Sequence, residues 1–226
     1  RSALQANTEG DYNTALGFSA LNANTTPDGN VAVGYEALKA NTTGTGVTAL
    51  GYHALTVNTT GSYNVAIGNF ALDANTTAAS NTAIGYNALT ATTTGDLNTA
   101  VGRDAMIANT TGEYNVTIGS YALDANTTGS NNTAIGYNSL SGNTTAGDNV
   151  AVGKDSMYAN TTGTYNTGLG RSCLESNTTA NYNTGVGYSA LKQNTTGADN
   201  TAVGYKSLED NTTAADNSAL GYIALN

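Results

Sequence analysis

The sequence predicts an all-β fold, a β-solenoid or β-roll in which thirteen coils of 17 residues are stacked. Three observations lead to this fold class. A glycine returns at every seventeenth position, a Thr/Val–Ala–aliphatic run precedes it, and an Asn-Thr-Thr turn signal closes most coils. A fixed period without insertion or deletion is the signature of a stacked array. The repeated glycines are Gly17, Gly34, Gly51, Gly68, Gly85, Gly102, Gly119, Gly136, Gly153, Gly170, Gly187, Gly204 and Gly221.

Each coil begins with a short strand that runs up to the repeated glycine, as in Asn81-Thr82-Ala83-Ile84-Gly85. β-Branched and small residues ended by glycine predict a strand of about four or five residues. Because side chains alternate along a strand, Thr/Val and the aliphatic residue point to one face and Ala to the other. Both faces carry small or apolar residues, so we expect both faces to be buried.

The second part of each coil carries a column of leucines, which is replaced only by Met106 and Met157 and never by Val or Ile. This exclusion of β-branched residues favours a helical turn or an irregular bend over a strand. The coil then closes on Asn-Thr-Thr, in which the Asn side chain can bond to its own backbone.

Stacking at strand spacing would place like residues above like residues in ladders. In-register asparagines are expected to hydrogen-bond to the equivalent asparagines of the coils above and below. These bonds disfavour a shift of one coil's register against the next. Val47 and Thr92 each interrupt an asparagine ladder. The ladder residues of two representative coils are Asn81, Ile84, Gly85 and Leu89, and Asn132, Ile135, Gly136 and Leu140.

The repeat predicts a partial coil over residues 1–12 and one continuous array, a single elongated domain, over 13–226. Each coil offers two large aliphatic side chains. One column can fill the interior of the coil, and the other would then meet its copies on a shared axis, which favours a homotrimer. End-to-end stacking of subunits into a filament is the alternative, because open sheet edges tend to pair.

Composition argues against several classes of function. The net charge of −9 disfavours nucleic acid as a partner, and no apolar run approaches the length needed for membrane insertion. Cys173 is the only cysteine, so neither a disulfide framework nor a paired-thiol metal site is expected. His53 is the only histidine and has no nucleophile at a fixed spacing. We therefore predict no enzyme, no metal and no cofactor.

An aromatic column follows the repeated glycine, and Arg103 or Lys154 can replace it, which indicates that this position reaches water. Aromatic faces could stack on sugar rings or pack across a subunit boundary. Both interpretations stay open at this point. The candidate contact residues are Tyr35, Tyr52, Tyr86, Tyr137, Tyr188 and Tyr205, with Arg103 and Lys154.

The Asn-Thr-Thr triplets also fit the acceptor pattern for N-glycosylation, with Asn24, Asn41 and Asn58 as the first candidates. A turn ladder explains the same residues without modification. The threonine ladders also suggest an ice-binding solenoid. However, adjacent threonines of an extended backbone point to opposite faces, which disfavours a flat threonine array.

The motif Asn-Thr-Ala-Val-Gly-Tyr over Asn200–Tyr205, with variants in the other coils followed by Ala-Leu and by Asn-Thr-Thr-Gly in many of them, resembles known fibre repeats. It looks like the Asn-Ser-Val-Ala-Ile-Gly repeats of trimeric autotransporter adhesin heads. It is also similar to arrays in phage tail fibres and related bacterial surface proteins. The resemblance implies a left-handed β-roll, three associated chains and attachment to a host surface. The 17-residue coil departs from the adhesin heads, whose coils are usually shorter.

These observations together predict an extracellular, cell-surface or virion protein that serves as a structural or adhesive fibre segment. Its expected partners are further copies of itself and a cell-surface glycan or envelope protein, met through many weak contacts. A purely structural filament subunit and an ice-binding solenoid are the two alternatives.

Overall fold

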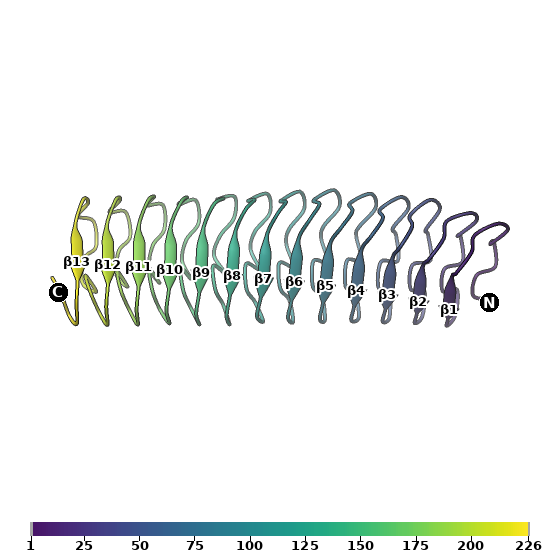
Figure 1. The fold of residues 1–226 in the computed structure, drawn as a ribbon, viewed down its shortest axis with the longest axis horizontal. Helices are drawn as coiled ribbons and strands as arrows, with labels where there is room; N and C mark the ends of the chain where they lie inside the picture. The colour runs from purple at the N-terminus through teal and green to yellow at the C-terminus, as the bar shows by residue number, and fades with distance from the viewer. Residues whose placement is uncertain (1, 226) are drawn as a thin grey trace. The chain divides into compact units, whose positions relative to one another are not determined.

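The computed structural model describes residues 2–225, and this part of the chain is all-β, with thirteen short parallel strands and no helix. The strands stack as a β-solenoid of about 12 turns, with 17 residues between equivalent positions. Figure 1 shows each coil as one strand followed by a long loop that returns to the start of the next strand. The predicted fold class is confirmed.

The chain forms two units, Arg1–Glu113 and Tyr114–Asn226. The first unit holds β1 (Thr14–Leu16), β2 (Val31–Val33), β3 (Thr48–Leu50), β4 (Val65–Ile67), β5 (Thr82–Ile84) and β6 (Thr99–Val101). The second unit holds β7 (Val116–Ile118), β8 (Thr133–Ile135), β9 (Val150–Val152), β10 (Thr167–Leu169), β11 (Thr184–Val186), β12 (Thr201–Val203) and β13 (Ser218–Leu220).

Within each unit the register advances by 17 residues at every step. Strand β5 pairs with β6 through Thr82↔Thr99 and Ile84↔Val101, and β8 pairs with β9 through Ile135↔Val152. Each strand has three residues, fewer than the predicted four or five. It ends earlier because the next residue, the repeated glycine, has a φ of 131–143° and turns the backbone away from the strand.

Only glycine fits at the repeated position, because its φ is positive and because the backbone of the next coil lies very close to it. A Cβ added to Gly136, whose φ is 131°, would lie 2.7 Å from both the carbonyl carbon and the carbonyl oxygen of Gly153 in the next coil. Any side chain at this position would therefore displace the neighbouring coil. The constant glycine thus reports how closely successive coils are stacked.

The two faces of each strand differ in burial. The central residue, such as Ala83 or Ala134, points into the coil and is fully buried. The aliphatic residue that ends the strand points outward and stays partly exposed, at 37% in Ile84 and 43% in Ile118. The prediction that both strand faces are buried is therefore wrong for the single chain, since only one face of the wall borders the interior.

The leucine column fills the interior, and its members from Leu21 to Leu191 are fully buried together with Met106 and Met157. These residues have a φ of 50–53°, which is the left-handed region. A β-branched side chain is poorly tolerated at such a φ, which explains why Val and Ile never occur here. The bend is therefore irregular, and the alternative of a helical turn is wrong.

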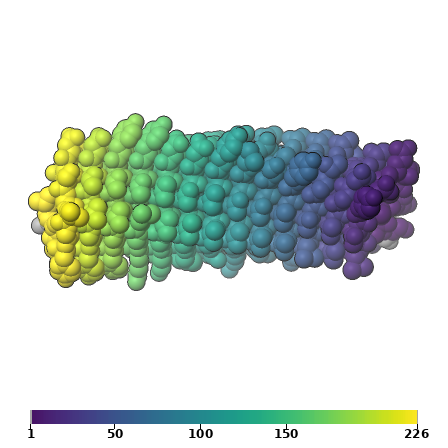
Figure 2. All heavy atoms as spheres, viewed as in Figure 1, coloured from purple at the N-terminus to yellow at the C-terminus, as the bar shows by residue number. Residues whose placement is uncertain are grey.

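Backbone hydrogen bonds between coils continue through the bends. The N–H of Leu38 donates to the carbonyl of Ala54 at 2.9 Å, and the N–H of Thr42 donates to that of Thr59 at 2.9 Å. In Figure 2, successive coils within each unit lie directly against one another, with no hollow between them on the face shown. Loops that would be mobile in isolation are thus held by the same ladder as the strands.

Candidate functional site

The asparagines that precede the strands form a buried structural ladder. The backbone N–H of Asn81 donates to Asn64 Oδ1 at 2.9 Å, and Asn81 Nδ2 donates to the carbonyl of Gly95 at 2.9 Å. Asn132 repeats this arrangement with Asn115 and Ala146. The side-chain oxygen thus receives a backbone N–H of the next coil, rather than only the neighbouring amide that the sequence predicts. These residues are not available to a ligand.

The asparagines of the Asn-Thr-Thr turns bond amide to amide, as predicted. Asn41 Nδ2 donates to Asn24 Oδ1 at 3.0 Å and to the carbonyl of Gly44 at 2.8 Å. Asn58 Nδ2 donates to Asn41 Oδ1 at 3.0 Å. All three residues are fully buried. Because a glycan would have to occupy this nitrogen, we expect Asn24, Asn41 and Asn58 to be unmodified in the folded chain.

Both interruptions of the asparagine ladders have consequences in the structure. At Thr92 no amide is present to donate to the coil before it, and the buried Oδ1 of Asn75 has no hydrogen-bond partner. Thr92 Oγ1 instead donates to the carbonyl of Asn109 at 3.2 Å. At Val47 the backbone N–H still donates to Asn30 Oδ1 at 2.9 Å, but the Val47 side chain offers no acceptor to the next coil. Each interruption is therefore a local weakness of the interior.

The aromatic column, defined as the residue after each repeated glycine, lies on the surface. Its six candidate tyrosines are 41–48% exposed. Tyr35 and Tyr52 stack with ring centroids 5.4 Å apart, and Tyr188 and Tyr205 stack at 5.3 Å. Since stacked rings cover one another's faces, these tyrosines present their edges and hydroxyls to the solvent. Face-on stacking of a sugar ring would require a ring of the stack to be displaced.

The remaining candidates of this column do not form such stacks with each other. Tyr86 meets Phe70 edge to face at 6.2 Å, and the ammonium of Lys154 lies 5.7 Å from the ring centroid of Tyr137. Arg103 Nε pairs with Asp104 at 2.9 Å, and Lys154 Nζ pairs with Asp155 at 3.5 Å. The column therefore accommodates aromatic and cationic side chains alike, as a water-facing surface does.

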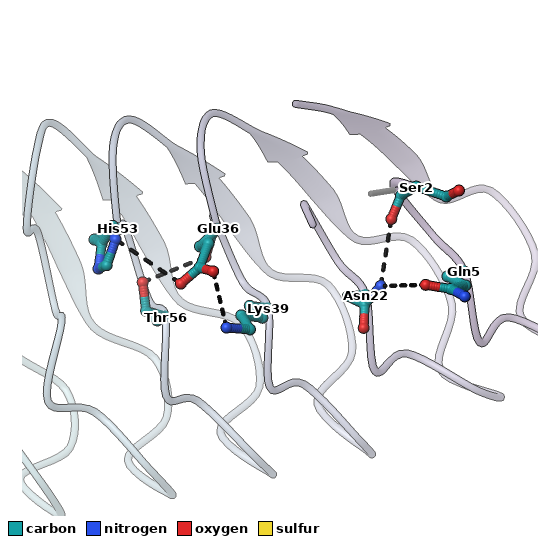
Figure 3. Close-up of polar contacts among 7 residues, drawn as sticks. All are labelled: Ser2, Gln5, Asn22, Glu36, Lys39, His53 and Thr56. Carbon is teal, nitrogen blue, oxygen red and sulfur yellow. Dashed lines mark hydrogen bonds and ion pairs between the residues drawn. The ribbon is translucent and has the colours of Figure 1, made fainter. Parts of the chain in front are cut away.

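Figure 3 shows the polar contacts around His53 in the first unit. Glu36 accepts a hydrogen bond from Lys39 Nζ at 2.9 Å, and its other oxygen lies 3.9 Å from His53 Nε2. The imidazole stacks on Tyr52 with centroids 4.2 Å apart. Farther along, Asn22 Nδ2 donates to Gln5 Oε1 at 3.3 Å. The contacts of His53 with Glu36 and of Asn22 with Gln5 link neighbouring coils, whereas Lys39 and Glu36 belong to the same coil.

Two titratable side chains are perturbed by their surroundings. Burial raises the pKa of the Cys173 thiol to about 12, which keeps it protonated and unreactive. Burial also raises the pKa of Asp73 above 3.8, against the opposing effects of the His53 charge and a hydrogen bond from Thr56. No group of three or more His, Cys, Asp or Glu side chains in residues 2–225 is placed to hold a metal ion. Within the same residues no helix has the length and apolar character of a membrane span.

The outward side of the strands, which we call the strand face, carries the aliphatic column that does not fill the interior. It consists of the first and third residues of β1–β13, for example Thr133 and Ile135. The first residue is Thr, Val or Ser, and the third is Leu, Val or Ile. The absence of charge at these positions in every coil is visible in the sequence, and it is the signal that the sequence analysis did not use.

Comparison of the chain with family models, curated proteins and solved structures gives no match. The resemblance to fibre repeats therefore rests on the repeat pattern, and the assignment to a family stays a prediction. Left-handed winding also stays a prediction.

Proposed function

We propose that the chain is a structural or adhesive fibre segment that acts outside the cell, on a cell surface or on a virion, as a homotrimer. The observation that carries this proposal is the contrast within each coil. Interior positions are nearly constant and form ladders from coil to coil, whereas outward positions such as the aromatic column vary. Such a wall is stiff, because backbone and side-chain bonds tie each coil to its neighbours, and it can display different residues at a regular spacing.

The display would act by multivalency. A single exposed ring edge or ion pair binds weakly, but a repeated array converts later contacts into intramolecular ones and raises the overall affinity. Cell-surface glycans and envelope proteins are the proposed partners. Because the stacked tyrosines offer edges and hydroxyls, we expect hydrogen bonds and edge contacts rather than face-on sugar stacking.

The absence of catalysis is part of the same proposal. The Cys173 thiol is buried, and His53 lies 3.9 Å from a Glu36 oxygen and stacks on Tyr52. A nucleophile paired with a base is the usual requirement for covalent hydrolysis. We propose that neither residue has a chemical role.

Glycan-array and whole-cell binding assays test the adhesive function. The wild type is expected to bind at least one surface glycan or envelope protein. Replacing Tyr188 and Tyr205 together by serine, the residue found at Ser120 of the same column, should weaken binding several-fold. No binding to any surface would contradict the adhesive function and leave the structural one.

Electron microscopy tests the fibre against the filament. Particles of one uniform length support a fibre segment of fixed size. Particles whose length grows with protein concentration would instead support the self-assembling filament.

A further inference from the structure

We propose that the strand face is the surface through which copies of this chain pack together. This inference rests on the proposed function and deepens it, because it selects the contact surface from several exposed columns. The occupant is a second copy of the chain, and a third where the copies close around an axis.

The first argument is the distribution of charge. The chain carries 16 acidic and 7 basic residues, yet none of them lies at the first or third position of any strand from β1 to β13. Depletion of charge is the compositional mark of the buried centre of a protein interface. An acidic chain that keeps the outward side of its strands free of charge in each unit has surfaces suited to contact with other neutral faces.

The second argument is the type of sheet. Sheets made only of parallel strands occur almost always with both faces covered. Here the inner face is covered by the leucine column, while the outer face leaves Leu50 at 44% exposure and Leu169 at 37%. The outer face of this parallel sheet therefore has partly exposed aliphatic side chains and no element of the chain packed against them. A second neutral strand face would supply it.

The third argument is the area available. One three-residue strand and one coil of rise offer about 50 Å² of face. The six strands of the first unit offer about 300 Å² and the seven strands of the second about 350 Å², whereas a specific interface buries about 800 Å² per partner. Association would therefore need most of the strands at once. It should also fail when a few buried charges are introduced, since each would have to lose its water without a partner.

The aromatic column is the competing surface. It carries Arg103, Lys154 and Arg171 in natural copies of the repeat, and Arg103 and Lys154 are exposed. The centre of an interface is depleted of charged residues, so a column that carries a cation in three coils of one chain is poorly suited to that centre. The column is therefore expected to border the interface or to lie outside it.

The experiment compares lysine substitutions on the two surfaces. The strand-face variant is Ile67→Lys with Ile135→Lys, one site in each unit. The matched control is Tyr86→Lys with Tyr137→Lys, which introduces at the aromatic column a residue that already occurs there as Lys154. Circular dichroism should show unchanged β structure in both, because all four side chains are at least partly exposed.

Native mass spectrometry of the full chain gives the outcome. The wild type and the control should have the mass of two or three chains of 22.8 kDa each, and the strand-face variant should have the mass of one. A wild type that is a single chain, or a strand-face variant that keeps the wild-type mass, overturns the proposal.

Two further outcomes distinguish self-association through the strand face from adhesion and from ice binding. An oligomer that binds no glycan would remove the adhesive function while leaving the strand face as the contact surface. A wild type that is a single chain, and that shows thermal hysteresis lost in the strand-face variant, would assign the face to ice and contradict association.

Discussion

Interior and outward columns of the coil accept very different residues, although they lie only three positions apart in the chain. The leucine column admits Leu and Met alone, whereas the aromatic column admits Phe, Tyr, Asn, Arg, Ser and Lys. An interior residue contacts copies above and below it, so one substitution disturbs three coils. An outward residue can turn toward water. Stacking and backbone conformation therefore restrict the sequence more than hydrophobicity does.

The largest effect is expected where a side chain has no space. Gly136→Ala should lower the free energy of unfolding by about 3 kcal/mol or more, because it combines a strained φ with a displaced neighbouring backbone. The matched control is Gly29→Asn, at a position with a φ of 67° and no atom within 4 Å of an added Cβ. Asn131 already occupies the equivalent place with a φ of 61°. Urea denaturation that finds equal losses in the two variants would contradict the close stacking.

A swap of two isomeric residues tests the interior against the strand face. Leu123→Ile should cost about 1–3 kcal/mol, because a β-branched side chain is strained at a left-handed φ. Ile118→Leu, on the outward strand face where Leu50 and Leu169 occur naturally, should change stability by less than about 0.5 kcal/mol. Thermal unfolding measures both. If Leu123→Ile is as stable as the wild type, the positive φ does not explain the leucine column.

Repair of a ladder should stabilise the chain. Thr92→Asn supplies an amide to the unpartnered Oδ1 of Asn75 and is expected to add about 1–2 kcal/mol to the free energy of unfolding. Thr94→Asn is the control, because that side chain is exposed and lies outside the asparagine ladders. A loss of stability in Thr92→Asn, seen by chemical denaturation, would mean that the coil at this position no longer has room for the amide.

The smallest effect concerns a carboxyl group on the surface. Since burial raises the pKa of Asp73 above 3.8, the folded chain binds this proton more tightly than the unfolded chain. The charged form therefore lowers stability above the folded pKa, and this loss is relieved as the pH falls. Asp73→Asn should raise the melting temperature slightly at neutral pH, and the gain should vanish below pH 3.8. A gain of equal size at both pH values would exclude titration as its cause.

The period, the strand positions and the ladders follow from the sequence because each coil repeats the same residues at the same spacing. Other features depend on contacts that no single coil contains. The left-handed φ of Leu89 is held by bonds to adjacent coils, and leucine does not signal it, whereas Asn87 is of a residue type that often adopts this conformation. Likewise Ile84 and Leu89 are equally aliphatic, yet only the closed coil decides which of them points inward.

The aromatic column illustrates the same limit for the candidate site. Sequence alone indicates that Tyr188 and Tyr205 reach water, and the structure agrees. That their rings cover each other depends on the distance between coils, which is a property of the stack. The distance between the tyrosine rings of successive coils was therefore needed to choose edge contact over face-on sugar stacking.

Disulfide formation between introduced cysteines tests the central claim, that like residues lie above like residues at every seventeenth position. In a chain with Cys173→Ala, Ile135→Cys with Val152→Cys joins two residues paired in register on the strand face. Ile135→Cys with Val150→Cys shifts the pair by two residues on the same face, which separates the Cα atoms to about 8 Å, beyond the reach of a disulfide. The account predicts rapid cross-linking within single chains for the first pair and none for the second. Equal cross-linking of both pairs, or of the second alone, would contradict the register on which the whole fold depends.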